Sequence, residues 1–310
     1  MCTVICLGHA VLDRIYTVPH LPAGSTKVRA TAYTEVGGGM ASSAACAIGR
    51  LLDPAADRVE FWGRTGDDSA ATIIRADLVR FGVDVSHLHV FAGRTSSQSA
   101  VMVDPAGERM VVNYRGDTPL DDMSWLPFER IATADAALTD VRWLEGGREL
   151  LSAARAAGIP SVLDADLGDV PIVRGLVPLA EHAIFSEPGL ANWAGHGDNE
   201  VALKAAVAAG AKIAGVTQGE KGVTMLVEGS FHHVPAFEVT VVDTLGAGDI
   251  FHGAYALAIA EGKTALDAAR FASAAAAIKC SRPGGRAGSP VRGEVERLLS
   301  GIRDQGSGIR

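Results

Sequence analysis

The sequence predicts an α/β protein built on a mostly parallel central sheet. Short apolar runs that are typical of buried strands alternate with longer segments in which apolar residues recur at helical spacing. Of the 310 residues, 48% are hydrophobic but only 5% are aromatic, so burial depends on Ala, Val, Leu and Ile. This mixture suits helices that pack on a parallel sheet. The length is compatible with one large domain, which we expect to span 1–310.

Strand and helix segments follow one another in the order that a parallel sheet with helical crossovers requires. Apolar runs predict strands at 3–7, 59–62, 136–139, 161–164, 183–185 and 213–217. Apolar residues at helical spacing predict helices at 39–52, 70–81, 149–157, 201–209 and from about 248 onward. The chain contains no internal repeat. We therefore expect each crossover to be built once, within a single sheet.

Two segments, at about 11–35 and 95–115, interrupt this alternation. Residues 97–103 form a short alternating stretch, and Pro105-Ala106-Gly107 marks a turn after it. Alternation of this kind is typical of half-exposed strands. We expect both segments to be β excursions inserted after parallel strands.

The most informative stretch is the glycine turn, Asp243-Thr244-Leu245-Gly246-Ala247-Gly248-Asp249, which leads into a helical pattern. Gly246 and Gly248 permit a positive φ or a close approach of a ligand to the backbone, and Ala247 adds little bulk. The first N–H groups of a helix have no intrahelical partner and attract anions. Asp249 has two interpretations: a helix cap, or a general base that accepts the proton of an attacking hydroxyl.

Weaker signals lie near other strand ends. Asp13 follows the first strand, where a carboxylate is placed to bind sugar hydroxyls, although a surface turn aspartate has the same pattern. Gly37-Gly38-Gly39 opens a predicted helix. The stretch 217–222 predicts an ordinary turn when taken alone. The loop at 282–288, rich in Gly and Pro, is a candidate for an adenine pocket or a monovalent-cation loop.

Composition excludes several classes of protein. The net charge is −8 and no basic run is present, which argues against a general nucleic-acid binder. No stretch reaches the ~18 to 20 apolar residues needed to span a membrane. The four cysteines have no metal-ligand spacing, and we expect them to be buried small hydrophobes in a reducing compartment: Cys2, Cys6, Cys46 and Cys280. The expected location is therefore the cytoplasm.

The glycine turn resembles the second signature of the PfkB family, the ribokinase-like carbohydrate kinases, and Gly37-Gly38-Gly39 resembles the first. The resemblance implies a ribokinase-like three-layer fold, in which helices flank a mostly parallel sheet and the two β excursions form a small β-sheet lid. It implies an ATP-dependent phosphotransferase that acts on an alcohol group. In that reaction Asp249 is the base, and Gly246, Ala247 and Gly248 stabilise the transferring phosphoryl group.

The resemblance also implies how the nucleotide and its metal are held. Contacts to ATP are assigned to six residues: Ser186, Thr217, Gly219, Gly222, Gly246 and Gly248. The family commonly carries Asn-x-x-Glu after a middle strand, whereas this chain has Ser186-Glu187. Glu187 is therefore the candidate contact of Mg²⁺, through a different spacing or through water. A monovalent cation such as K⁺ is a further implied cofactor.

A narrower resemblance, to the sulfofructose kinases within this family, covers nearly the whole chain and includes 13–16, 140–143, 185–190 and 282–286. It implies that Asp13 and the three glycines Gly37, Gly38 and Gly39 bind the sugar. It implies that a sulfonate is held by Lys27, Asn113 and Arg142. Taken singly, these three are also compatible with a solvated lysine, a turn asparagine and a surface arginine. The implied reaction converts 6-deoxy-6-sulfofructose and ATP to the 1-phosphate and ADP, at the C1 hydroxyl.

Three other functions stay open at this point. The first is a PfkB kinase for another ketose or ketose phosphate, such as fructose, fructose 6-phosphate or tagatose 6-phosphate. The second is a sugar- and nucleotide-binding regulator that has lost catalysis. The third is a dinucleotide oxidoreductase. The absence of a Gly-x-Gly-x-x-Gly motif after the first strand argues against this function. An open β edge in the lid favours a homodimer through that sheet.

Overall fold

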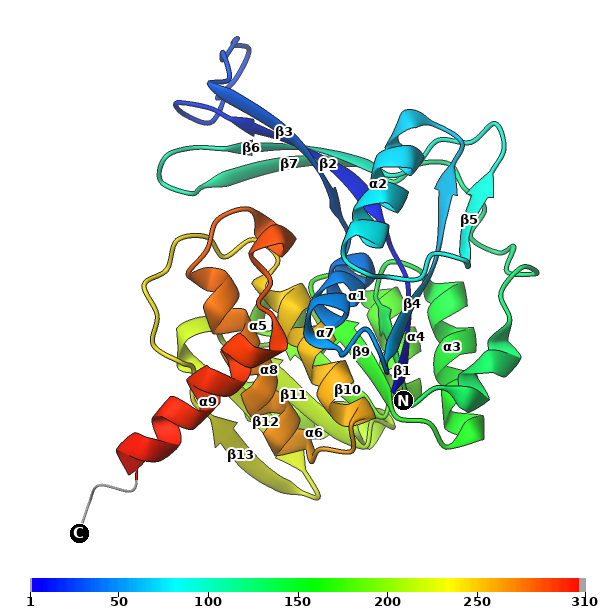
Figure 1. Cartoon of the computed structure of the whole chain (residues 1–310), viewed down its shortest axis with the longest axis vertical. Coiled ribbons are helices and arrows are strands. Elements are labelled where there is room, and N and C mark those ends of the chain that lie inside the picture. Colours follow the sequence, from blue (N-terminus) through cyan, green and yellow to red (C-terminus); the bar gives the residue numbers. More distant parts are fainter. Residues whose placement is uncertain (1, 307–310) are drawn as a thin grey trace.

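A nine-stranded sheet forms the centre of the molecule, and its strands run largely parallel (Figure 1). The computed structural model describes residues 2–306. The strand order is β13-β12-β11-β10-β9-β8-β1-β4-β5, and only the β11–β12 and β12–β13 pairs are antiparallel. The strands are β1 (Thr3–Leu7), β4 (Arg58–Gly66), β5 (Leu88–Phe91), β8 (Ala136–Asp140), β9 (Ser161–Ala165), β10 (His182–Ser186), β11 (Ile213–Thr217), β12 (Val223–Val227) and β13 (Ser230–Val234). The predicted parallel sheet is confirmed.

Helices cover both faces of this sheet, because its strands are apolar on both sides. In β1, Val4 and Cys6 join the cluster on one face, whereas Ile5 and Leu7 join a cluster on the other. The first face is covered by α1 (Met40–Leu51), α2 (Ser69–Arg80), α7 (Ala247–Ala260), α8 (Ala265–Cys280) and α9 (Arg292–Gly306). The second is covered by α3 (Leu144–Ala157), α4 (Val170–Leu176), α5 (Glu187–Ala194) and α6 (Asn199–Ala209). This arrangement is the expected three-layer fold.

The helix predicted at 149–157 begins earlier, at Leu144. Its first turn was not predicted, because that turn contains Gly146 and Gly147 and glycine is a poor helix former. Both glycines are explained by close packing. A Cβ on Gly146 would lie 2.7 Å from the indole of Trp143, and one on Gly147 would lie 3.1 Å from Leu176.

A second, four-stranded sheet projects from the main body as a lid (Figure 1). Its order is β3-β2-β6-β7, from β2 (Val11–Thr17), β3 (Ala32–Gly38), β6 (Gln98–Val103) and β7 (Arg109–Tyr114). The two β excursions therefore pair with each other, through parallel β2 and β6. All six residues of β7 are exposed, including Val111 and Val112. The homodimer through this sheet stays a prediction.

The cysteines only partly follow the expectation of burial. Cys6 and Cys46 are fully buried, but Cys2 and Cys280 are partly exposed, so the prediction was wrong for these two. Cys2 immediately precedes β1, and Cys280 is the last residue of α8, so both lie at the ends of elements. Burial nevertheless raises the pKa of Cys46 and of Cys2 to about 12, which disfavours the reactive thiolate.

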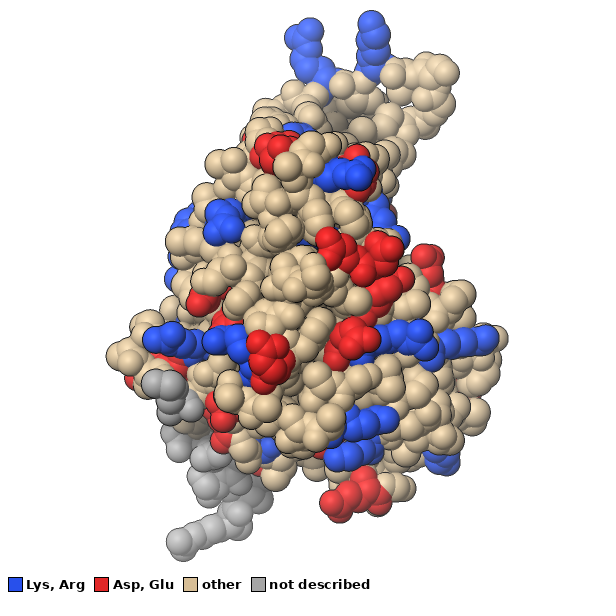
Figure 2. Space-filling model, turned by 90° about the vertical axis from the view of Figure 1, so that its right-hand side faces the viewer, with Lys and Arg blue, Asp and Glu red and all other residues tan. Residues whose placement is uncertain are grey.

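Surface charge and helix length concern two kinds of possible partner, nucleic acids and membranes. On the face that Figure 2 presents, basic and acidic side chains are interspersed and form no continuous basic patch. This distribution agrees with the net charge of −8. Within residues 2–306, none of the helices combines the length and apolar character that a membrane span needs.

The contact between α1 and α7 provides a test of the packing. A Cβ on Gly253 of α7 would lie 2.4 Å from the carbonyl oxygen of Ala44 in α1. We expect Gly253→Ala to lower the free energy of unfolding by about 2 kcal/mol, because the two helices must separate. Gly301→Ala is the control, since a Cβ there meets nothing within 4 Å and the residue is exposed. It should stabilise the helix by roughly 0.5 to 1 kcal/mol. Urea unfolding measures both, and equal effects would contradict the packing argument.

Candidate active site

Two cavities open where the parallel strands end, as expected for an open α/β sheet. The first, of about 440 Å³, is lined by residues that include Thr217, Gly219, Gly222, Thr244, Ala247 and Gly248. The second, of about 370 Å³, is lined by residues that include His9, Gly39, Ser99, Asn113, Arg115 and Arg142. The first cavity thus collects part of the glycine turn and of the stretch 217–222, whereas Gly246 and Asp249 line neither cavity. The second collects the lid and the ends of β1 and β8.

The glycine turn has the geometry of an anion site. Gly246 is the N-cap of α7 and has a φ of 76°, in the left-handed region that favours glycine. A Cβ on Gly248 would meet nothing within 4 Å, so its surroundings are open to a ligand. The first N–H groups of α7 therefore border the first cavity. Asp249 lies three residues after the N-cap, so the capping interpretation of this residue was wrong.

The carboxyl of Asp249 is a stronger base than an ordinary aspartate. Burial raises its pKa well above the usual value, and the neighbouring Asp164, Asp166 and Asp140 raise it further. The nearby His252 acts in the opposite direction. A base with a raised pKa binds a proton more tightly once it has accepted one. The local chemistry therefore suits proton removal from a hydroxyl.

Two residues beneath Asp249 were missed from the sequence. Asp164 at the end of β9 is 1% exposed, and its carboxylate has no hydrogen-bond partner among the described residues. Its Oδ2 lies 3.4 Å from Nδ1 of His252. The same imidazole contacts the carbonyl oxygens of Gly248, at 2.8 Å, and Ile184, at 3.2 Å. His252 therefore fixes the first turn of α7 against the sheet.

A buried ammonium holds the start of the glycine turn. Lys279 of α8 is fully buried, and its Nζ donates to the carbonyl oxygen of Asp243, at 2.5 Å, and lies 3.0 Å from Oδ2 of the same residue. The Asp243 carboxylate also accepts from the amides of Leu245, at 2.8 Å, and Gly285, at 3.0 Å. Burial acts to raise the pKa of Asp243, but these donors and Lys279 hold it below the usual value. The carboxylate of Asp243 therefore anchors the start of the glycine turn.

The predicted nucleotide residues divide into two groups. Thr217, Gly219 and Gly222 line the first cavity, beside the glycine turn. Ser186 lies at the N-terminus of α5, where its Oγ accepts from the amide of Gly189 at 3.1 Å. It also donates to Asp166. Ser186 is thus engaged in capping and is not among the lining residues.

Glu187 suits an indirect contact with Mg²⁺. Its Oε1 accepts from the side-chain amides of Asn199, at 3.2 Å, and Gln218, at 3.1 Å. Hydrogen bonds from Gln218 and Asn199 lower its pKa, so the group is ionised. Within residues 2–306 no cluster of three acidic, His or Cys side chains is placed to hold a metal. Mg²⁺ takes most of its ligands from phosphates and water, which fits one ionised carboxylate nearby.

The predicted sugar residues Asp13, Gly37, Gly38 and Gly39 lie in or next to the lid strands β2 and β3, but only Gly39 lines the second cavity. Asp13 lies within β2, where a Cβ on Gly38 would approach its Oδ2 to 2.0 Å. Burial raises the pKa of Asp13, while a hydrogen bond with Ser99 and the charge of Arg286 oppose that rise. Ser99 in turn accepts from Nδ2 of Asn113 at 3.0 Å. Gly38 is therefore required for the approach of Asp13 to the backbone.

The three predicted sulfonate residues are not all brought together. Asn113 and Arg142 line the second cavity, together with Gly39. Lys27 is exposed in the segment between β2 and β3 and is not one of the lining residues. Residues 18–31 contain no regular strand or helix, so no element directs Lys27 toward the cavity.

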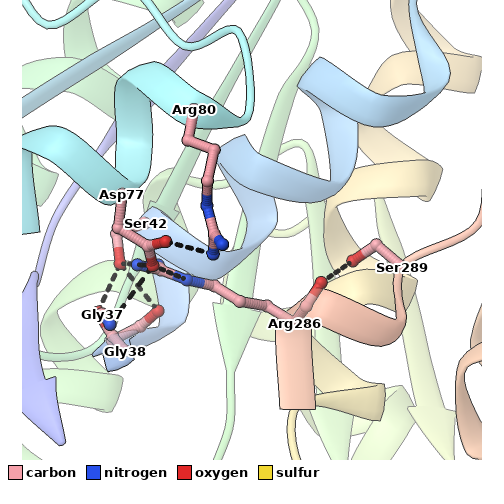
Figure 3. A network of polar contacts seen from close by, with 8 residues as sticks. Gly37, Gly38, Ser42, Asp77, Arg80, Arg286 and Ser289 are labelled. Atoms are coloured by element: carbon pink, nitrogen blue, oxygen red, sulfur yellow. Dashed lines mark hydrogen bonds and ion pairs between the residues drawn. The ribbon is translucent and has the colours of Figure 1, made fainter. Parts of the chain in front are cut away.

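None of the residues of the loop at 282–288 lines the first cavity, although the amide of Gly285 bonds Asp243 at the start of the glycine turn. The adenine pocket and the monovalent-cation loop both stay predictions. Arg286 of this loop is buried and reaches the base of the lid (Figure 3). The guanidinium donates from Nε to Asp77 at 2.9 Å and from Nη1 to Ser42 at 3.3 Å. Asp77 also accepts from the amide of Gly37 at 3.2 Å. Arg286 therefore clamps α1, α2 and the end of β3.

Comparisons with known proteins agree with this geometry. The sequence profile of the pfkB family carbohydrate kinases matches residues 1–292. The chain is 29% identical to the ribokinase of Bacillus subtilis (strain 168) over 305 residues, which cover 97% of this chain and 100% of that protein. It is 31% identical to the fructoselysine 6-kinase of Escherichia coli (strain K12) over 221 residues, covering 68% and 78% of the two chains.

The solved structures give the same result. A crystal structure from Agrobacterium tumefaciens, provisionally described as a ribokinase, has a TM-score of 0.91 and 38% identity and covers 98% of this chain and 99% of its own. The fold also matches the Arabidopsis thaliana ribokinase complexed with ribose and ATP, with a TM-score of 0.84, 24% identity and coverage of 96% and 98%. Since the profile spans nearly the whole chain, this protein belongs to the pfkB family of carbohydrate kinases, which are ATP-dependent phosphotransferases.

Proposed function

We propose that this sugar kinase transfers the γ-phosphoryl group of ATP to the C1 hydroxyl of 6-deoxy-6-sulfofructose, giving the 1-phosphate and ADP. The observation that supports this substrate is the shared cavity of Asn113 and Arg142, which supplies an amide and a guanidinium for an anionic group. The resemblance gives Lys27 the same task. Since Lys27 lies outside the cavity, the proposal rests on the other two residues.

The proposed reaction proceeds by direct displacement. The C1 oxygen attacks the γ-phosphorus, the bond from phosphorus to the β–γ bridging oxygen breaks, and the hydroxyl proton passes to Asp249. The N–H groups at Gly246, Ala247 and Gly248 stabilise the charge on the transferring group. Glu187 would help to hold Mg²⁺, which would neutralise part of the charge on the phosphates. The lid excludes water and so limits hydrolysis of ATP.

Nucleotide and cations complete the proposal. ATP occupies the first cavity, with Thr217, Gly219 and Gly222 beside its phosphates. Glu187 contacts Mg²⁺ through water. A monovalent cation such as K⁺ is implied by the family resemblance.

The role of Asp249 as base is tested by Asp249→Asn. We expect kcat to fall by about 10³-fold, within the range of general base catalysis. ATP binding, measured by isothermal titration calorimetry, should change little, because the first cavity and its amides are retained. Asp121→Asn is the control, since Asp121 is exposed and lies outside both cavities. Turnover by Asp249→Asn at the rate of the control would reject the proposed base.

The influence of Asp164 on that base is tested by the pH dependence of kcat/KM. Activity requires ionised Asp249 and is lost as the pH falls through its raised pKa. Burial also raises the pKa of Asp164 well above its usual value, so Asp164 acts on Asp249 only where it is itself ionised. Replacing Asp164 by Asn removes that negative charge, so the acid limb of the profile should move to lower pH. Asp121→Asn should leave the limb in place. An unmoved limb in Asp164→Asn would separate Asp164 from the base.

The substrate is tested by steady-state kinetics with three ketoses. We expect kcat/KM for 6-deoxy-6-sulfofructose to exceed that for fructose by at least about tenfold, because a hydrogen bond to a charged group is worth ~1.5 to 3 kcal/mol. Fructose 6-phosphate is the matched anionic competitor, with nearly two charges at neutral pH. A preference for fructose or for fructose 6-phosphate would overturn the sulfofructose assignment and leave a kinase for another ketose.

A further inference from the structure

We propose that Arg115, backed by the buried Arg64, acts with Arg142 as a guanidinium clamp for the anionic end of the sugar. This inference rests on the proposed function and names the substrate class more closely: a ketose whose end remote from the reacting hydroxyl carries a sulfonate or phosphate. Neither Arg64 nor Arg115 is distinguished by any sequence motif. Both are recognised only from their positions around the second cavity.

The two arginines that line the cavity are held by backbone carbonyls. Arg115 donates from Nη2 to the carbonyl oxygen of Arg142 at 3.0 Å. Arg142 donates from Nη2 to the carbonyl oxygen of Leu167 at 3.0 Å. An arginine has five N–H donors, so each guanidinium is oriented by one nitrogen and keeps others for a ligand. Preorganised guanidiniums of this kind suit planar or bidentate contacts with anionic oxygens.

Arg64 adds a third positive charge behind this pair. It lies on β4 with its Cζ 3.9 Å from the ring centre of Trp143, the residue after Arg142. It is 9% exposed, and its Nε and Nη1 have no hydrogen-bond partner among the described residues. A buried charge without a partner is costly. Stacking on the indole compensates for part of that cost and leaves the charge itself unpaired.

The three charges act on the same cavity residue. Burial lowers the pKa of His9 to about 4, and the charges of Arg64, Arg142 and Arg115 contribute to the decrease. His9 lines the cavity. Burial and the charge of Arg115 likewise lower the pKa of Arg64, to about 10. The contacts give the same grouping: Arg115 donates to the carbonyl oxygen of Arg142, and Arg64 stacks on Trp143, the next residue.

Nearby carboxylates do not form ion pairs with the guanidiniums of Arg64, Arg115 and Arg142. Within residues 2–306 none of the three arginines has an acidic oxygen within the 4 Å of an ion pair. Asp140, whose charge does reach Arg64, uses its oxygens to accept from the backbone amides of His9, Ala41 and Arg142. Asp169 also lines the cavity and the charge of Glu145 also reaches Arg64, but among the described residues neither forms an ion pair with the three guanidiniums. Three neighbouring guanidiniums without an ion-pair partner are what an anionic ligand would neutralise. A neutral sugar would leave their repulsion in place.

The clamp is tested by comparing anionic and neutral substrates in variants that lack one guanidinium. We expect Arg115→Gln to lower kcat/KM at least about tenfold for 6-deoxy-6-sulfofructose and for fructose 6-phosphate, mainly through KM. For fructose the change should stay within about twofold. Arg64→Lys keeps the charge but loses the stacked plane, and should show a smaller loss confined to the same two anionic substrates. Arg148→Gln is the control, since Arg148 is an exposed arginine of α3 outside both cavities.

A binding measurement separates the clamp from the reaction. Inorganic sulfate should raise the melting temperature of the unmodified protein and of Arg148→Gln, and should raise that of Arg115→Gln less. This result would support the clamp even if the protein phosphorylated none of the three ketoses, in which case only the proposed function would fail. The clamp is overturned if Arg115→Gln lowers kcat/KM equally for fructose and the anionic ketoses, or if sulfate stabilises Arg115→Gln as strongly as the unmodified protein.

Discussion

The carboxylate of Asp140 ties together the three chain segments on which the second cavity depends. Oδ2 accepts from the amides of His9, at 2.9 Å, and Ala41, at 3.0 Å, and Oδ1 accepts from the amide of Arg142, at 2.8 Å. One buried side chain therefore joins the ends of β1 and β8 to the first turn of α1. A Cβ on Gly8 would lie 2.5 Å from Oδ2, so glycine at that position permits the approach. The lid, the sugar site and the start of α1 inherit their relative positions from this contact.

Two further buried charges hold loops in the same way. Lys279 anchors the glycine turn through Asp243, and Arg286 anchors the base of the lid through Asp77. In each pair the buried member also donates to a carbonyl or hydroxyl oxygen, which satisfies the hydrogen bonding that burial demands. Irregular loops have no ladder of backbone hydrogen bonds to define their shape. Multiply bonded charges supply that definition where the reacting groups must be oriented within fractions of an ångström.

The fold and the glycine turn can be predicted from the sequence, whereas much of the rest of the site cannot. Strand β1 and the turn before Asp249 are local patterns, and their prediction needs no knowledge of distant residues. Arg286 and Lys279 bind partners that lie 209 and 36 residues away in the sequence, so these contacts cannot be predicted from a local pattern. Asp164 was hidden for the same reason, because its neighbour His252 comes from another layer of the fold. The start of α3 was not predicted because it contains two glycines. They are needed for close packing, but in the sequence they indicate the end of a helix.

The site is electrically asymmetric, and this asymmetry bears on which hydroxyl reacts. Asp249 lies among Asp164, Asp166 and Asp140, whose charges act on it together. Arg115 and Arg142 line the second cavity, and Arg64 stacks on Trp143, the residue after Arg142. A ketose with an anionic end is repelled by the carboxylates and attracted by the guanidiniums, so the two groups favour the same orientation of the sugar. In the proposed reaction, that orientation directs the anionic end away from Asp249 and presents the hydroxyl at the opposite end to it. A neutral ketose lacks this preference, so both of its ends compete for the base. Under the proposed function, the charge arrangement couples the choice of substrate to the choice of reacting hydroxyl, because the same anionic group decides both.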